Sequence, residues 1–355
     1  MCSIGHDGFD VANHPITIVG GGLAGLTLGI GLRRQGIPVT IWEAGTYPRH
    51  RACGEFISGQ GQGVLRRLGL LDSFIKAGMR EATTAMFVAE CAEGPVHQVG
   101  PPALCLSRYT MDAMLAREFQ SAGGQLRIEQ RWPGQFSDGV VRAAGRRARS
   151  HQNGWIWFGL KVHARNVSLK ADLELHCRKN GYVGLCRLPA GETNVCGLFR
   201  RPVCGEAQPL NWRDFLRGAP DTFLHERLRT AVFDESSFCS VAGLSLLPQR
   251  ASLLTECCIG DALTMIPPAT GNGMSMAFEA AELAIEPLAA FSRETLPWGE
   301  TRRAIAQACD RRFAQRLTWA NWLQRLIFMP GMGGMFTGMA LRSEWLWRAF
   351  FARTR

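Results

Sequence analysis

The sequence predicts an α/β protein in which a domain built on parallel strands is interrupted by a mostly antiparallel β-sheet domain and followed by a C-terminal helical segment. Three observations lead to this prediction. Residues 15–44 have the order strand, glycine turn, helix and strand, which is typical of a βαβ unit. Residues 155–199 contain runs of alternating side chains, which indicate strands with two different faces. Residues 319–355 are rich in Trp, Met and Gly.

The composition places the chain among globular proteins. Its 355 residues are 46% hydrophobic, which is enough to bury a sizeable core. The formal net charge of +10 comes mainly from arginine, but the basic residues stand in short groups without the spacing of a helix-turn-helix or a zinc finger. We therefore expect no nucleic-acid partner. A positive surface is better suited to an anionic cofactor, a carrier-linked substrate or an anionic membrane face.

The cysteines and the hydropathy pattern limit the class further. Twelve cysteines contain no Cys-x-x-Cys pair, and the closest two are the neighbours Cys257 and Cys258, so the sequence predicts no metal site. The first residues lack the basic and apolar regions of a secretory signal, and no uninterrupted apolar window reaches the length of a membrane span, about 18 residues. We expect a cytoplasmic protein with reduced thiols, either free or peripheral to the membrane.

The first chemically informative stretch is PITIVGGGLAGLTLGIGLRRQGIPVTIWEA at residues 15–44. The pattern predicts strand, helix and strand at residues 16–19, 26–35 and 38–42. Gly20 allows a tight turn, Gly22 allows the backbone to approach a pyrophosphate, and Gly25 allows the helix to pack on the strand. Glu43 follows the second strand, where a carboxylate accepts hydrogen bonds from ribose hydroxyls. The unit predicts a Rossmann-type dinucleotide site that includes Leu23, Ala24 and Ala44 as further contacts.

A second stretch, IGDALTMIPPATGNGMSMAFEAAELA at residues 259–284, distinguishes between dinucleotides. Asp261 would follow a strand over residues 253–260, after which two prolines delay the next helix. The loop offers one carboxylate, which suits a polyol chain, and one bare helix N-terminus, which suits the negative charge of a reduced flavin. An ordinary loop with a glycine cap would explain the glycines but not the whole order. We therefore expect FAD rather than NAD, with contacts from Gly260, Asp261, Pro268, Gly271, Asn272, Gly273 and Met274.

With these motifs the sequence resembles the FAD-dependent oxidoreductases of the para-hydroxybenzoate hydroxylase fold. Residues 20–43 resemble the family's AMP-binding motif, and residues 260–273 resemble the motif whose Asp holds the ribityl chain. Residues 51–55, Arg-Ala-Cys-Gly-Glu, are similar to the segment of a branch that includes geranylgeranyl reductases and related biosynthetic oxygenases. Residues 107–112 resemble a helix start whose arginine lies along the FAD. The resemblance implies bound FAD, with Arg51 and Arg108 among its contacts, and NAD(P)H as a transient reductant.

One position departs from the monooxygenases of this family. Where these usually have an Asp-Gly motif linked to FAD and NADPH, the sequence has Ala144-Gly145. This departure leaves the expectation of FAD in place and leaves the mode of NAD(P)H use open. The sequence has no second glycine fingerprint for a nicotinamide, in agreement with transient binding.

The middle of the chain predicts the substrate side. Residues 155–163 alternate between an aliphatic face and a face that carries Trp155, Trp157, Lys161 and His163, which would either line a substrate cavity or face solvent. Residues 182–188 and 193–199 predict a hairpin. We expect this sheet to cover the flavin ring, with the substrate between them.

Four side chains are candidates for chemistry, because a flavin performs the difficult step and the protein supplies orientation, exclusion of water and a proton acceptor. His163 is the best base by type, although a lone histidine on a strand is more often structural. Cys53 and Glu55 follow from the resemblance, and a small buried cysteine is the simpler interpretation of Cys53. Tyr182 is the fourth candidate.

These assignments divide the chain. The FAD-binding domain is assigned to residues 1–80, 106–150 and 246–318, and the substrate domain to residues 81–105 and 151–245. Residues 319–355 are interpreted as an apolar helical cap on the FAD-binding domain. The alternatives for this segment are an adaptable mouth for an apolar substrate and an interfacial anchor.

The favoured function is monooxygenation of a hydrophobic aromatic or polyketide-like metabolite in a biosynthetic pathway, through a C4a-hydroperoxyflavin. The alternatives are a reductase or dehydrogenase of carbon–carbon double bonds, a flavin halogenase and a flavin-binding partner without chemistry. Residues 182–186 lack the Trp and Phe of the geranylgeranyl reductase pattern, and Leu160-Lys161 stand where Ile-Pro should follow the Trp-x-Trp of halogenases. The sequence leaves open a monomer or a homodimer, and contact with a membrane or a carrier protein.

Overall fold

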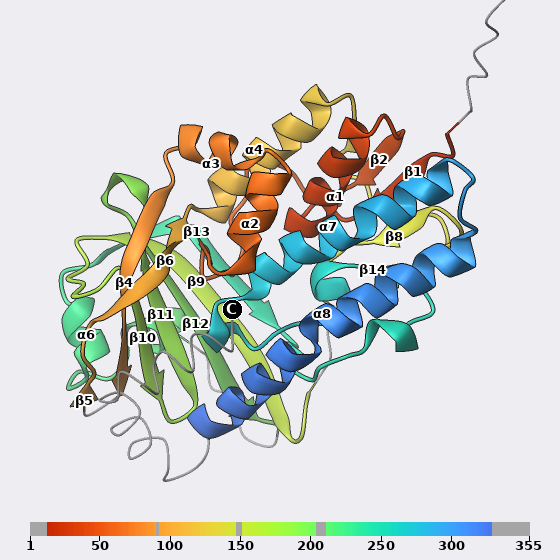
Figure 1. The fold of residues 1–355 in the computed structure, drawn as a ribbon. Coiled ribbons are helices and arrows are strands. Elements are labelled where there is room, and N and C mark those ends of the chain that lie inside the picture. The colour runs from red at the N-terminus through yellow and green to blue at the C-terminus, as the bar shows by residue number, and fades with distance from the viewer. Residues whose placement is uncertain (1–12, 90–91, 147–150, 204–210, 329–355) are drawn as a thin grey trace, which may run out of the picture.

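The chain forms two β-sheets with helices packed around them (Figure 1). The computed structural model describes residues 13–328 except 90–91, 147–150 and 204–210. Within these residues, a five-stranded sheet, here called sheet A, has the order β14-β8-β1-β2-β7 and all its strands are parallel. Its strands are β1 (Ile16–Val19), β2 (Val39–Trp42), β7 (Gln125–Arg127), β8 (Val140–Arg142) and β14 (Cys257–Cys258).

Sheet A is buried because its short β-branched strands carry apolar side chains toward the covering helices. Ile16 and Ile18 of β1 and Ile41 of β2 are fully buried. The helices that form this part of the core are α1 (Leu23–Arg34), α4 (Arg108–Ser121) and α7 (Gly273–Ser292). The carboxyl ends of β1, β2 and β8 point to one edge of the sheet, which is where open α/β sheets bind ligands.

The second sheet, here called sheet B, has nine strands in the described residues and follows the order β13-β9-β12-β11-β10-β4-β6-β3, with β5 beside β4. Among the described strands of this sheet, only β10 and β4 pair in parallel. The strands are β3 (Phe56–Ile57), β4 (Arg80–Ala89), β5 (Ala92–Glu93), β6 (His97–Cys105), β9 (Trp155–Arg165), β10 (Leu173–Arg178), β11 (Gly181–Arg187), β12 (Thr193–Pro202) and β13 (Val232–Ala242).

Shorter helices complete the two parts, and a long C-terminal helix runs beside α7 (Figure 1). These elements are α2 (Gln60–Arg67), α3 (Leu71–Lys76), α5 (Trp212–Arg217), α6 (Phe223–Arg227) and α8 (Trp298–Ile327). Buried Glu279 of α7 binds Arg312 and Arg316 of α8, which fixes the two long helices to each other. No helix of the described residues is both long and apolar enough to cross a membrane.

Most of the expected elements are present. The strands at residues 16–19 and 39–42, the helix after residue 272, strand β9 and the hairpin of β11 and β12 are confirmed. The helix expected to begin at residue 26 begins at Leu23, because the glycine turn leads directly into it. The Ser107 hydroxyl accepts a hydrogen bond from the Thr110 amide, which explains why α4 begins at Arg108.

Two expectations about the C-terminal third need correction. The predicted strand over residues 253–260 is wrong, since only Cys257 and Cys258 pair with β8 and residues 251–253 form a 3-10 turn. Arg302 binds the carbonyl oxygens of Leu254 and Thr255, so these groups are not available to a sheet. The segment 319–355 does not begin as a separate unit, because its first residues continue α8 to Ile327. Residues 329–355 lie outside the described residues.

Candidate functional site

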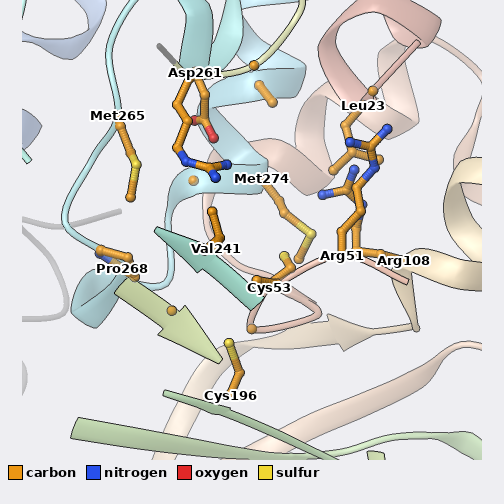
Figure 2. A pocket seen from close by; sticks show the side chains of 18 of the residues that line it. Leu23, Arg51, Cys53, Arg108, Cys196, Val241, Asp261, Met265, Pro268 and Met274 are labelled. Carbon is orange, nitrogen blue, oxygen red and sulfur yellow. The ribbon is translucent and has the colours of Figure 1, made fainter. Parts of the chain in front are cut away.

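A cavity of about 880 Å³ lies between the carboxyl edge of sheet A and the inner face of sheet B (Figure 2). This volume lies within the range of roughly 300–1,000 Å³ that is usual for ligand pockets. Most of the residues expected to contact FAD line it: Gly20, Gly22, Leu23, Ala24, Glu43, Ala44, Arg51, Arg108, Asp261, Pro268, Gly271, Gly273 and Met274. Gly25, Gly260 and Asn272 lie behind this wall rather than in it.

The glycine turn between β1 and α1 forms one end of the cavity. Gly20 has a φ of +113°, and a Cβ atom there would lie 2.4 Å from the carbonyl oxygen of Ala143. A Cβ on Gly25 would lie 2.0 Å from the carbonyl oxygen of Gly20, which confirms the close packing of helix on strand. At Gly22 a Cβ would meet nothing within 4 Å, although the residue lines the cavity. The backbone at the N-terminus of α1 is therefore open to an anionic group.

Glu43 lies at the end of β2, and its side chain already holds the turn together. One carboxylate oxygen accepts a hydrogen bond from the Gly21 amide at 2.9 Å, and the other accepts bonds from the Gly45 amide and Arg49. Burial by itself raises the pKa of Glu43, but these donors and the charge of Arg51 outweigh it and hold the pKa below its usual value. Glu43 is therefore an ionised carboxylate at the cavity wall.

Arg51 and Arg108 lie side by side near Leu23, and both line the cavity (Figure 2). Asp112, which is fully buried, accepts hydrogen bonds from Arg108 at 2.7 and 2.8 Å and from Arg51 at 2.9 Å. One carboxylate thus orients two guanidinium groups, while Nη2 of Arg51 makes no hydrogen bond among the described residues and lies 3.6 Å from Glu43 Oε2. A buried donor that lacks a hydrogen bond beside a helix N-terminus suits a bound anion.

Asp261 lies on the opposite wall of the cavity (Figure 2). Its side chain is exposed to the open cavity, while protein atoms surround the site on most sides. This burial raises the pKa of Asp261, and the charges of Arg108 and Arg146 offset the effect only in part. A carboxylate in this situation gains from hydroxyl groups that donate to it.

The backbone around Asp261 requires glycine at two positions. Gly260 has a φ of +60° and Gly271 a φ of +66°, in the left-handed region. A Cβ on Gly260 would lie 2.9 Å from the Cβ of Ala24, so the two predicted cofactor motifs are in direct contact. Asn272 is buried and lies 3.4 Å from the Ser58 hydroxyl through its Oδ1, and α7 begins immediately after it. The N-terminus of α7 therefore opens on the cavity at Gly273.

The four candidate catalytic residues fall into two groups, according to whether they line the cavity. Cys53 and Tyr182 line the cavity, whereas Glu55 and His163 do not. Glu55 is completely buried, and it accepts a hydrogen bond from the Arg108 amide at 2.8 Å and binds His163 Nε2 at 2.6 Å. Burial by itself would raise the pKa of Glu55, but His163 and Lys161 reverse the effect and lower it. Glu55 and His163 thus form an ion network behind the cavity wall.

The two candidates in the wall are both uncharged. Burial raises the pKa of the Cys53 thiol, which makes it a poor nucleophile. Burial also raises the pKa of Tyr182 well above its usual value. The Tyr182 hydroxyl lies near the backbone of Ala269 but has no hydrogen-bond partner of good geometry among the described residues. It is therefore a free polar group in an apolar wall.

The remainder of the cavity is an apolar chamber between sheet B and the loop before α7. It is defined by side chains that belong to one hydrophobic cluster and also line the cavity: Leu175, Tyr182, Leu198, Val241, Leu244, Met265 and Ala269. The sequence did not decide whether the face of β9 that carries Trp157 and Lys161 lies toward the cavity or toward solvent. It lies on the cavity side, because Trp157 packs in this cluster and Lys161 is completely buried. The cavity therefore has a charged end at sheet A and an apolar end at sheet B.

Some functional residues were not found from the sequence. Asp112 follows Arg108 by four residues on one helix, a spacing that predicts an ion pair, but its second partner Arg51 comes from a separate loop. His50 and Arg146 also line the cavity, and no motif marks them. Among the described residues, no group of three or more His, Cys, Asp or Glu side chains could hold a metal ion.

Comparison with known proteins gives an FAD-binding domain in the first half of the chain. Residues 13–168 match the family model described as an FAD binding domain. No curated protein sequence matches the chain. The turn, the acid at Glu43 and the paired arginines described above all fall within the matched residues.

Several solved structures share the architecture over nearly the whole chain. The flavin-dependent brominase Bmp2 has a TM-score of 0.73 and 17% identity, with 96% of this chain and 92% of that chain covered. A geranylgeranyl bacteriochlorophyll reductase-like protein from Thermoplasma acidophilum has a TM-score of 0.72 and 16% identity, with 96% and 97% covered. PqsL from Pseudomonas aeruginosa, a probable FAD-dependent monooxygenase, has a TM-score of 0.66 and 15% identity, with 92% and 100% covered.

At these identities the likeness shows the fold, and the names of the three neighbours refer to different reactions. The expected cofactor and the expected fold are both confirmed. The chain carries an FAD-binding domain and has the fold of the FAD-dependent oxidoreductases related to para-hydroxybenzoate hydroxylase.

Proposed function

We propose that this protein is an NAD(P)H-dependent flavin monooxygenase that hydroxylates a hydrophobic aromatic or polyketide-like metabolite. The observation that carries the proposal is the apolar chamber that continues from the charged end of the cavity. Leu198, Val241, Leu244 and Met265 offer an uncharged surface to a ring system, and the Tyr182 hydroxyl offers one hydrogen bond to orient it.

The charged end fits the cofactor. Its backbone opening at Gly22, the Nη2 of Arg51 that lacks a hydrogen bond and the orientation of Arg108 by Asp112 suit a pyrophosphate. Asp261, whose pKa is raised by burial, suits hydroxyl groups of a ribityl chain. When bound, FAD would supply two-electron redox chemistry, with electrons from NAD(P)H and oxygen as the acceptor.

The residues of the chain supply the rest of the mechanism. The apolar chamber excludes water from the substrate, and Tyr182 donates a hydrogen bond to a polar atom of the ring system. Arg51 and Arg108, at the opposite end, would hold the anionic part of the cofactor. Ala144, which stands at the position of the usual acid, also lines the cavity, so the chain supplies no carboxylate there for the use of NAD(P)H.

A second candidate is reduction of carbon–carbon double bonds. Cys53 and Gly54 line the cavity, and they belong to the segment that resembles the geranylgeranyl reductase branch. The reductase-like neighbour from Thermoplasma acidophilum has nearly the same TM-score as the brominase, so fold similarity does not separate the reactions. Bromination or chlorination is tested in the same experiment.

The test measures products of the purified flavoprotein with NAD(P)H and a panel of phenols, aromatic polyketides and prenyl alkenes. Incorporation of one ¹⁸O atom from labelled O₂ supports the monooxygenase. Anaerobic gain of two hydrogen atoms by an alkene supports the reductase instead, and halide-dependent substitution supports a halogenase. Consumption of neither oxygen nor NAD(P)H would leave a binding protein without chemistry.

A pair of variants tests the chamber itself. Val241→Trp fills the chamber, so we expect KM for a bulky substrate to rise at least about tenfold while the FAD content stays unchanged. Val232→Trp on the same strand is the matched control, because Val232 is 62% exposed. Equal KM values for the two variants would show that the substrate binds elsewhere.

A further inference from the structure

A lysine lies directly under the cavity floor. In sheet B, Lys161 of β9 is paired with Cys196 of β12 on one side and Cys239 of β13 on the other. Directly paired residues point their side chains to the same face of a sheet. Since Cys196 and Cys239 line the cavity, Lys161 also points to the cavity side. Lys161 is nevertheless completely buried and does not line the cavity itself.

The loop of residues 50–55 covers this lysine with two partners. Lys161 Nζ lies 3.5 Å from Glu55 Oε1 and 3.0 Å from His50 Nδ1. An ammonium group can only donate hydrogen bonds, so His50 Nδ1 is the acceptor in this pair. The neutral His50 ring therefore carries its hydrogen on Nε2, the nitrogen that points away from Lys161.

His50 itself lines the cavity and is half-buried, so it has access to both the cavity and solvent. Its ring is stacked on Tyr109, with ring centroids 4.6 Å apart, and stands at 90° to the ring of His163. The ionisable groups around it are Lys161, His163, Glu55 and Asp234. Burial, together with the positive charges of Lys161 and His163, lowers the pKa of His50 to about 4. The ring is neutral at physiological pH and fixed in one orientation.

We propose that His50 is the proton donor of the cavity and that Lys161 is the group that supplies it with a proton. The proposal rests on the proposed function, because that reaction consumes one proton: RH + O₂ + NAD(P)H + H⁺ gives ROH + H₂O + NAD(P)⁺. His50 delivers this proton, which ends on the oxygen atom that leaves as water. The reductase alternative has the same demand, because reduction of a double bond by NAD(P)H also takes up one proton.

The transfer balances over two steps. In the first, His50 gives its Nε2 proton to the acceptor in the cavity and takes a proton from Lys161 at Nδ1, which leaves a neutral amine beside Glu55. In the second, solvent returns a proton to Nε2 and the Nδ1 proton goes back to Lys161. Both side chains are then restored, and one proton has moved from water to the cavity.

Glu55 and His163 act in this arrangement as positioning residues. The Glu55 carboxylate stabilises the Lys161 ammonium in a site without solvent, and His163 binds the second carboxylate oxygen at 2.6 Å. This arrangement explains why His163, the best base by residue type, lies behind the wall: it holds Glu55, which in turn holds the lysine. The half-exposed Glu192 lies 3.6 Å from the other nitrogen of His163.

The first test does not require turnover. In protein labelled with ¹⁵N-histidine, the ring nitrogen shifts of His50, assigned with His50→Ala, report its tautomer. We expect the Nε2–H tautomer in the wild type, and in Lys161→Met a pKa of His50 that is higher than about 4, because the neighbouring positive charge is gone. The Nδ1–H tautomer in the wild type would overturn the proposal, because His50 could then not accept from Lys161.

The second test uses the purified holoenzyme. We expect His50→Ala to lower kcat on the order of 10²-fold, the lower end of general acid catalysis, with an unchanged FAD content. Added imidazole should restore at least a tenth of the wild-type kcat, since the half-exposed position leaves room for it. His151→Ala, at an exposed histidine, is the control and should keep wild-type kcat.

The outcomes separate the two proposals. Wild-type turnover that survives in His50→Ala, or a loss that imidazole does not restore, overturns the role of His50 alone. Absence of product in the wild type overturns the proposed function, and the tautomer of His50 then decides the relay by itself.

Discussion

The substitution Asp112→Asn tests the idea that one buried carboxylate builds the charged end of the cavity. Asp112 is fully buried and accepts three charged hydrogen bonds of 2.7–2.9 Å from Arg51 and Arg108. Asparagine keeps the shape but has one acceptor oxygen, and its amide group meets a guanidinium donor. Removing one partner of a buried ion pair costs about 3–5 kcal/mol. The Arg51 side chain keeps 30% exposure, so we expect the lower half of that range.

The expected shift in melting temperature follows from the size of the protein. An unfolding entropy of about 2.1 cal/mol/K per residue over 355 residues converts this loss into a decrease of roughly 4–5 °C. Far-UV circular dichroism during heating measures the decrease in FAD-free protein, and Asp138→Asn at an exposed turn is the control, with an effect within about 0.5 kcal/mol. A decrease of less than about 1 °C in Asp112→Asn would refute the role of Asp112 as the shared anchor of the two arginines.

Three further predictions concern the cofactor site and its pH dependence. Gly22→Val should leave the melting temperature near that of the wild type but lower FAD affinity at least about tenfold in a fluorescence titration, whereas Gly20→Val should unfold the protein, because its Cβ meets the Ala143 carbonyl; equal effects of the two would contradict the assigned geometry. Asp261→Asn should lower FAD affinity but leave the melting temperature of the FAD-free protein at pH 7 unchanged or slightly higher, because burial raises the pKa of Asp261 while solvent screens its exposed side chain; a fall in both would argue against this. The pKa of Glu55 is lowered in the folded state, so its carboxylate stabilises the fold above its usual pKa of 4.5 and this contribution is lost as the pH falls through the folded value; the difference in melting temperature between wild type and Glu55→Gln should thus shrink below about pH 4.5, and a constant difference would show that the charge of Glu55 is not what stabilises.

The parts of the fold that were predicted correctly have local causes. The βαβ unit follows from glycine positions and β-branched residues within one short segment, and the hairpin of β11 and β12 follows from alternation across a short turn. The strand predicted over residues 253–260 is wrong because its carbonyl groups bind Arg302, which comes from α8. The parallel pairing of β10 with β4 joins segments almost ninety residues apart, and side-chain alternation does not specify a partner.

The candidate site, like the fold, was predicted correctly where the signal is local in the sequence. Motifs found the residues that touch the cofactor end, because a dinucleotide imposes backbone geometry that only certain residues adopt. They did not separate Glu55 and His163 from Cys53, since sequence proximity does not show which side of a loop faces a cavity. His50 was missed because its role depends on Lys161, which lies on a distant strand.

Three side chains of the cavity wall depart from the usual local rules. Asp261 is a carboxylate with a raised pKa, Arg51 has a buried donor without a hydrogen bond, and the Tyr182 hydroxyl is unsatisfied in an apolar wall. Each of these costs free energy in the protein alone, and each is relieved by a group that the cavity would hold. Glu55 is different: it has a φ of +60° and a buried charge, yet protein donors satisfy it completely. Contacts within the protein therefore offset the free-energy cost of Glu55 without a ligand. This is expected for a residue that positions Lys161 and His50 rather than one that binds the cofactor or the substrate.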